Sequence, residues 1–285
     1  MKICRFRDPL GRVRAGVLTG EQTVVDLTPA GVQSLREILD APDPSARAAE
    51  CAERSHVRYL VPQVECLAPV ENQEVWAAGV TYLRSKKARM EESNFSATAY
   101  DRVYEAPRPE LFFKSMPEKV AGPGGRVGIR QDARWNVPEP ELALVHNARG
   151  QLVGFTIGND MSSRDIEGEN LLYLPQGKIY KNSCALGPVI TLGATEAEAR
   201  TWTISLVIER GNATVFAGET AVSQIKRSFE ELTGYLHRSQ EFPHGAILLT
   251  GTGIVPADDF TLQAGDVVAI RISGIGELRN TVAVV

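Results

Sequence analysis

Short apolar segments separated by polar turn residues dominate the chain from about residue 74 to its end. Asn147-Ala148-Arg149-Gly150 separates two such segments and predicts a four-residue hairpin loop. Gly211-Asn212-Ala213 separates another pair in the same way. The strands predicted in this part are 74–79, 141–146, 151–159, 202–210, 214–222, 245–249, 266–273 and 278–285.

Helical spacing is clear in one segment of this part. Ile225, Phe229, Leu232 and Leu236 predict an amphipathic helix within 224–239. The charged stretch 85–92 is interpreted as a helix or a flexible lid. Because strands and helices do not alternate regularly, the pattern favours a β-rich α+β fold over a doubly wound α/β fold.

The first seventy residues have a different pattern. Segments 13–18 and 22–27 resemble strands, and 34–54 is rich in alanine and charge, as helices are. Prolines near both ends of 61–70 are typical of a connector. We therefore predict a small N-terminal α/β domain at 1–70 and a catalytic domain at 71–285.

Composition narrows the class of protein. The 285 residues are 43% apolar, as in folded domains, and 31 basic against 35 acidic side chains leave a formal charge of −4. That balance gives no basic surface for nucleic acid. The four cysteines and four histidines are scattered, which argues against a zinc site or a disulfide framework. No apolar run reaches the ~18 residues of a membrane span and the first residues lack the apolar core of a signal peptide, so we expect a cytoplasmic protein.

The most informative chemistry is a pair of acids at the start of a predicted strand. Glu139 and Glu141 are two residues apart, so both side chains leave the same face of an extended backbone. Pro138 and Pro140 favour extension but cannot donate to a central ladder, which puts the pair at a strand's start or edge.

The hairpin brings a third acid to this face. If Asn147 and Gly150 close the loop, Asp160 lies opposite Val137, on the face of Glu139 and Glu141. Three converging carboxylates require a cation, and oxygen ligands suit Mg²⁺ or Mn²⁺. The alternative is a solvated strand edge with Asp160 in a turn.

Lys178 follows these acids in the chain. A lysine beside a divalent ion can act as a base, or it can remain charged and stabilise an enolate. The alternative is an ordinary solvated surface side chain.

Five motifs in order resemble the fumarylacetoacetate hydrolase superfamily, across about three quarters of the chain. They are Glu139-Pro140-Glu141-Leu142-Ala143; 158–165, Gly-Asn-Asp-Met-Ser-Ser-Arg-Asp; Lys178 ahead of Cys184-Ala185-Leu186-Gly187-Pro188; Leu249-Thr250-Gly251-Thr252; and 262–268, Leu-Gln-Ala-Gly-Asp-Val-Val, with Gly274-Ile275-Gly276.

The resemblance implies a mixed β-roll catalytic domain and a homodimer or homotetramer. It also implies that Glu139, Glu141 and Asp160 hold the metal. Lys178 would be an active-site lysine, with Arg164 and Thr252 near a bound oxyanion or carboxylate.

One departure separates this chain from the hydrolases of the superfamily. Those enzymes carry Gly-x-Asn-Tyr-x-x-His, whose histidine activates water, whereas this chain has Gly79-Val80-Thr81-Tyr82-Leu83-Arg84-Ser85. Ser85 stands where the histidine would be, so a base for water is missing there. Ser85 would contact a substrate hydroxyl or merely fill space.

The remaining motifs resemble the 2-keto-3-deoxy-sugar-acid dehydratases of the superfamily, those of 2-dehydro-3-deoxy-D-arabinonate above all. These motifs are Tyr82 to Arg89, Arg108 to Lys114, and Ile166-Glu167-Gly168-Glu169-Asn170. The implied function is a Mg²⁺-dependent hydro-lyase that yields 2,5-dioxopentanoate. The alternatives are a hydrolase or decarboxylase of an acylpyruvate, and a non-catalytic protein that binds a 2-oxo acid.

In the dehydratase interpretation, Lys178 removes a proton from carbon 3 of a 2-oxo acid whose carboxylate and keto oxygen bind the metal. Glu110 is the candidate acid for the hydroxyl that leaves carbon 4. Glu110 fits equally well as a structural carboxylate paired with Arg108 or Lys114. Ser85, Arg164, Lys178 and Thr252 would bind the substrate, although the Thr252 hydroxyl also suits a bond to its own turn.

Overall fold

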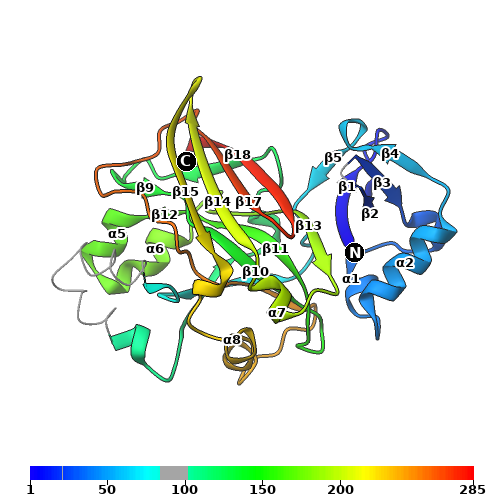
Figure 1. Cartoon of the computed structure of the whole chain (residues 1–285). Helices are drawn as coiled ribbons and strands as arrows, with labels where there is room; N and C mark the ends of the chain where they lie inside the picture. Colours follow the sequence, from blue (N-terminus) through cyan, green and yellow to red (C-terminus); the bar gives the residue numbers. More distant parts are fainter. Residues whose placement is uncertain (21, 84–101) are drawn as a thin grey trace.

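A computed structural model describes residues 1–20, 22–83 and 102–285 of the chain (Figure 1). Before residue 70 its elements are β1 (Lys2–Arg7), β2 (Val13–Thr19), β3 (Thr23–Asp26), the 3₁₀-helix η1 (Thr28–Ala30), α1 (Leu35–Leu39), α2 (Pro44–Arg54), β4 (Arg58–Leu60), η2 (Val61–Gln63) and β5 (Glu65–Leu67). After it come β6 (Glu74–Gly79), β7 (Glu110–Ser115), η3 (Pro117–Lys119), β8 (Arg126–Ile129), β9 (Asn136–Val137), β10 (Pro140–His146), β11 (Leu152–Asp160), β12 (Ser162–Ser163), α5 (Arg164–Glu169), η4 (Leu171–Tyr173), α6 (Leu174–Lys178), β13 (Cys184–Leu192), α7 (Glu196–Ala199), β14 (Thr203–Arg210), β15 (Ala213–Ala221), η5 (Val222–Gln224), α8 (Phe229–Leu236), β16 (Ala246–Leu249), β17 (Val267–Ile272) and β18 (Gly276–Val284).

Two large sheets organise these strands. The 11-stranded sheet has the order β4-β3-β2-β1-β13-β11-β10-β16-β6-β7, with β5 paired to β1. The 5-stranded sheet has the order β15-β14-β17-β18-β8, and β12 pairs with β9. The predicted β-rich α+β fold is therefore confirmed, and both predicted hairpins form.

The N-terminal strands continue the large sheet, because β1 pairs with β13. Helices α1 and α2 cover this end of the sheet, on the right of Figure 1. The predicted connector 61–70 is wrong in part. Between its prolines Cys66 pairs with Phe6, so β5 forms where the chain keeps its backbone donors. A domain boundary near residue 70 stays a prediction.

Strand β10 is buried on both faces. Leu142 and Leu144 belong to the core between the two sheets, together with buried side chains of β14 and β17. The alternate residues of β10, including Glu141 and Ala143, face the other way. The acids therefore leave the face of β10 that lies away from the core between the sheets.

The opposite layer of this core comes from the smaller sheet. Ile204, Leu206 and Ile208 alternate along β14, and all three side chains are fully buried. Ile270 on β17 joins them in the same apolar cluster as the β10 leucines. One face of β10 is thus occupied by packing, which leaves only the other face for polar chemistry.

The register of the β10–β11 hairpin differs from the prediction. Asp160 does not lie opposite Val137, which pairs with Ser162. Instead the backbone N–H of Asp160 donates to the carbonyl of Glu139 at 3.0 Å. The third acid therefore lies directly across from the first.

Two irregularities near the loop produce this register. His146 pairs with Leu152, so the loop is one residue longer than predicted. Val145 then pairs with Gly154, which leaves Val153 as an extra residue in a bulge. Each shift alone would turn Asp160 to the opposite face, but two shifts restore the predicted face.

Other elements differ from prediction mainly at their ends. The helical stretch 34–54 is two helices, because α2 restarts at Pro44 after Asp43, whose side chain accepts from the N–H of Ala46. Helix α8 begins only after Ser228, which caps it through Glu231. The charged stretch 85–92 lies outside the described residues. Within the residues that the structure places, no helix is long and apolar enough to cross a membrane.

Candidate active site

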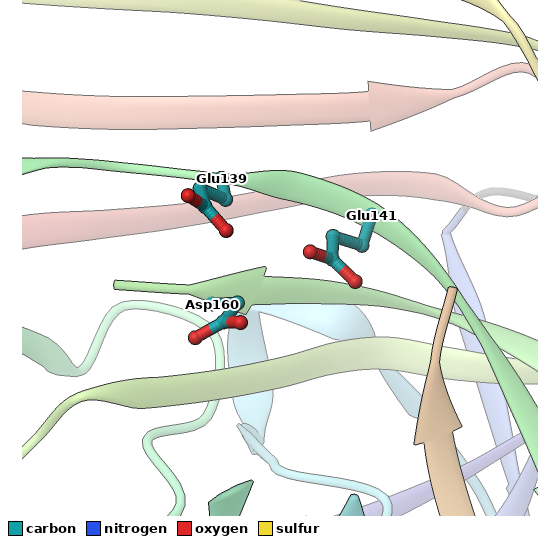
Figure 2. Close-up of side chains that lie close together, drawn as sticks. All are labelled: Glu139, Glu141 and Asp160. Atoms are coloured by element: carbon teal, nitrogen blue, oxygen red, sulfur yellow. The ribbon is translucent and has the colours of Figure 1, made fainter. Parts of the chain in front are cut away.

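Three carboxylates meet where β10 begins and β11 ends (Figure 2). Glu139, Glu141 and Asp160 are 4%, 1% and 1% exposed. One oxygen of each lies within 4.8 Å of the others, a spacing that one metal ion can bridge. The alternative of a solvated strand edge is therefore wrong.

Glu141 is the member of this group that most needs a cation. No lysine or arginine of the described chain forms an ion pair with it. Burial, and then the charges of Asp160 and Glu139, raise the pKa of Glu141 well above its ordinary value. Its Oε2 accepts the N–H of Gly251 at 2.6 Å, at a φ of +91° that favours glycine. A buried, oxygen-only group of this kind fits a divalent ion.

Lys178 ends helix α6 beside these acids and is 1% exposed. Its Nζ lies 2.5 Å from Glu139 Oε2 and 3.1 Å from Asp160 Oδ2. The ring centroid of Phe112 is 6.0 Å from the same nitrogen. The alternative of a solvated surface lysine is thus wrong, and the ammonium faces the carboxylates.

A second buried lysine was missed in the sequence. Lys114 is fully buried, forms an ion pair with Asp160, and donates to the carbonyls of Met161 and Lys178. Burial lowers its pKa. The sequence carries no clear signal for it, because Lys114 is an extra residue in β7 between Phe113, which pairs with Trp76, and Ser115, which pairs with Val75, so alternation does not give its face.

Glu167 was also missed as a site residue. It is 1% exposed, accepts the Ser162 hydroxyl at 2.6 Å, and lies 3.5 Å from Lys178 Nζ. It follows Arg164 by three residues in α5, so helical spacing puts both on one side of the helix.

The predicted substrate-binding residues have different surroundings. Arg164 lines the cavity but is 1% exposed, with Nη2 3.0 Å from Glu139 Oε1. The Thr252 hydroxyl donates to the Ile254 carbonyl at 3.2 Å and accepts its N–H at 3.3 Å, so it is engaged in its own turn. Ser85 lies outside the described residues.

Glu110 lines the same cavity from β7. The pairing with Lys114 considered from the sequence is wrong, because Lys114 binds Asp160. Arg108 lies over the ring of Tyr235, with 5.3 Å to the centroid. The Glu110 carboxyl lies so close against Gly79 that a Cβ at that position would overlap it.

One small cavity lies among these residues. Its walls include Glu110, Glu139, Glu141, Asp160, Arg164 and Lys178. Val80 also lines the cavity and has a φ of +52°, a strained conformation for a β-branched residue. The cavity brings the metal-binding carboxylates, the Lys178 amine and the Glu110 carboxyl group to one place.

Comparison with known proteins agrees with this geometry. Residues 74–283 match the family model described as fumarylacetoacetate (FAA) hydrolase, C-terminal. The chain is 46% identical over 217 residues to a probable 2-keto-3-deoxyxylonate dehydratase of Haloferax volcanii, covering 76% of this chain and 74% of the relative. It is 40% identical over 227 residues to the 2-dehydro-3-deoxy-D-arabinonate dehydratase of Saccharolobus solfataricus, covering 79% and 76%.

Solved structures extend the likeness to the whole chain. A 2-keto-3-deoxy-D-arabinonate dehydratase complexed with magnesium and 2,5-dioxopentanoate has a TM-score of 0.83 and 33% identity. Its apo form has a TM-score of 0.84. In each case the match covers 100% of this chain and 99% of the other.

Proposed function

The chain belongs to the fumarylacetoacetate hydrolase family, and on that premise we propose that it dehydrates a 2-keto-3-deoxy pentonate to 2,5-dioxopentanoate. The observation that carries the proposal is the buried Lys178 ammonium against the Glu139–Asp160 carboxylates inside the cavity. Relatives at 40% and 46% identity are named for this chemistry.

Glu139, Glu141 and Asp160 would hold a divalent ion, Mg²⁺ as in the related complex or Mn²⁺. When bound, the ion would chelate the carboxylate and keto oxygen of the substrate and draw negative charge toward that oxygen. Charge supports this choice. Glu167 adds a fourth buried carboxylate, against three buried cations in Lys114, Lys178 and Arg164. With a divalent ion this formal excess of one negative charge becomes one positive charge, which suits a mono-anionic 2-oxo acid.

Lys178 is the proposed base for the proton on carbon 3, which the adjacent keto group acidifies. Its ammonium first releases a proton to solvent, and the free amine then takes the proton from carbon 3. The electron pair forms the bond between carbons 3 and 4, and the hydroxyl on carbon 4 leaves as water with a proton from Glu110. A proton then moves from carbon 5 to carbon 3, and the resulting enol becomes the aldehyde. The sum is loss of one water from the pentonate.

Substrate contacts complete the proposal. Arg164 and Thr252 line the cavity and would hold the anion, and Ser85 would contact a hydroxyl. Arg164 also fixes Glu139 through its 3.0 Å ion pair. We further propose that the protein works in the cytoplasm and that it forms a homodimer or homotetramer. Sedimentation velocity would measure the number of subunits.

The direct test incubates the purified protein with Mg²⁺ and a 2-keto-3-deoxypentonate. We expect 2,5-dioxopentanoate by proton NMR, and its loss on chelation of the metal. Cleavage of an acylpyruvate at comparable efficiency without dehydration would contradict the proposal and favour the hydrolase alternative. Binding of a 2-oxo acid without turnover of either compound would favour the non-catalytic alternative.

A further inference from the structure

The Lys178 ammonium contacts three carboxylates, of which only two belong to the metal-binding group. Glu139 and Asp160 belong to the group that can hold a metal ion, whereas Glu167 does not. Glu167 is also the most distant of the three, at 3.5 Å. An ion that takes the oxygens of Glu139 and Asp160 therefore competes with Lys178 for the same partners.

We infer that Glu167 is a positioning residue, the counter-ion that retains the Lys178 ammonium when Glu139 and Asp160 bind a divalent ion. Like charges repel strongly in a buried site. An ammonium and a divalent ion that share the same carboxylates therefore destabilise each other. A carboxylate outside the metal-binding group can still pair with the ammonium after the ion has bound. This inference rests on the proposed function for its catalytic consequence, but its effect on metal binding does not.

The local structure holds Glu167 in place for this duty. The Ser162 hydroxyl donates to its Oε1 at 2.6 Å, the same oxygen that faces Lys178. Gly177, next to Lys178, packs against its side chain so closely that a Cβ there would lie 2.5 Å from Glu167 Cγ. Helices α5 and α6 thus bring the carboxylate and the lysine together with little freedom to separate.

The test is a double-mutant cycle read out by Mn²⁺ affinity, measured by electron paramagnetic resonance of free Mn²⁺. In the otherwise wild-type chain, Glu167→Gln should weaken Mn²⁺ binding by about 10- to 100-fold, because the ammonium then stays on the metal ligands. With Lys178→Met already present, the same substitution should have little effect. The matched control is Glu169→Gln, an exposed acid on the same helix, which should leave Mn²⁺ affinity unchanged.

Two further measurements secure the result. Ser162→Ala keeps the Glu167 charge but removes its hydroxyl partner, so it should weaken Mn²⁺ binding in the same direction by a smaller factor. At saturating Mn²⁺, Glu167→Gln should lower kcat by about 10²-fold with little change in KM, because the base is misplaced. Thermal unfolding of each metal-free variant checks that it folds.

Equal losses of Mn²⁺ affinity in both backgrounds would overturn the inference, because Glu167 would then act on the ion itself. So would a Glu167→Gln variant that behaves like Glu169→Gln. Failure of the proposed function is a separate outcome, since it would appear as absent dehydration by the wild-type protein.

Discussion

The two ends of strand β10 bury ionisable groups in opposite ways. At its start, Glu139 and Glu141 lie among other buried charges of both signs. At its end, His146 is fully buried, with Nε2 2.9 Å from the Thr233 hydroxyl and its ring 5.2 Å from that of His237. Burial, and then His237, lower the pKa of His146 to about 3.

The difference shows what a buried charge requires. His146 meets a hydroxyl and another imidazole rather than an acid, so it stays neutral at physiological pH. At the other end, Glu139 and Asp160 form ion pairs with two lysines and an arginine, which offset the repulsion between the acids. Glu141, which has no such partner among the described residues, has a raised pKa. The charged end is therefore suited to chemistry, and the neutral end to packing.

The largest effect is expected from the cation at the charged end. Lys178→Met should lower kcat by about 10³-fold, because it removes the proposed base while keeping the length of the side chain. Steady-state kinetics with saturating Mg²⁺ measure it, with Lys181→Met, an exposed neighbour, as the control. Near-wild-type turnover by Lys178→Met would show that another group takes the proton.

The next effect separates metal binding from stability. Glu141→Gln should abolish most of the rise in Tm that Mg²⁺ gives the wild-type protein, because a ligand stabilises the fold it binds. In the presence of a chelator, the variant should be at least as stable as the wild type, since a neutral amide replaces a buried carboxylate whose pKa is raised by its acidic neighbours. Differential scanning fluorimetry with and without Mg²⁺ measures both. A variant that keeps the full Mg²⁺ shift would mean that Glu141 is not a ligand.

Much of the site was predictable because it follows from short-range geometry. The Glu139–Glu141 spacing and the hairpin put three acids on one face, and the structure has them there. The register was wrong by two residues, one from the longer loop and one from the bulge at Val153, because neither has a clear signature in the sequence. The predicted face is nevertheless correct, because a shift of two residues returns each side chain to the same face.

The site residues that were not predicted depend on contacts between segments that are distant in the sequence. Lys114 reaches Asp160 from β7, and Glu167 reaches Lys178 from a neighbouring helix. Helical spacing fixes the face of Glu167 but not the partner that this face meets, and the extra residue in β7 leaves even the face of Lys114 open. The pairing of β5 with β1 has the same origin, because it joins residues about sixty positions apart.

We expect a pH effect of intermediate size on stability from His146, at the neutral end of β10. The ordinary pKa of histidine is about 6.5, so below it the unfolded chain takes up a proton that folded His146 refuses until about pH 3. Stability from this residue is therefore complete above about pH 6.5 and is lost as the pH falls, by at most about 1.4 kcal/mol per unit. Urea unfolding at pH 7 and pH 5 should show a smaller loss for His146→Gln than for the wild type. Equal losses would mean that His146 is not the neutral group at this end.

The smallest effect is expected from Thr252, an uncharged group at the charged end. Its hydroxyl already makes two bonds within its own turn, so it must give these up to hold a substrate. Thr252→Val should therefore lower the free energy of unfolding by about 1 kcal/mol and raise KM by no more than about fivefold, the worth of one neutral hydrogen bond. Thr252→Ser, which keeps the hydroxyl, is the control for both measurements. A rise in KM of two orders of magnitude for Thr252→Val alone would show that the hydroxyl leaves its turn to bind the substrate, and that an uncharged group contributes as much to this end of β10 as the ion pairs do.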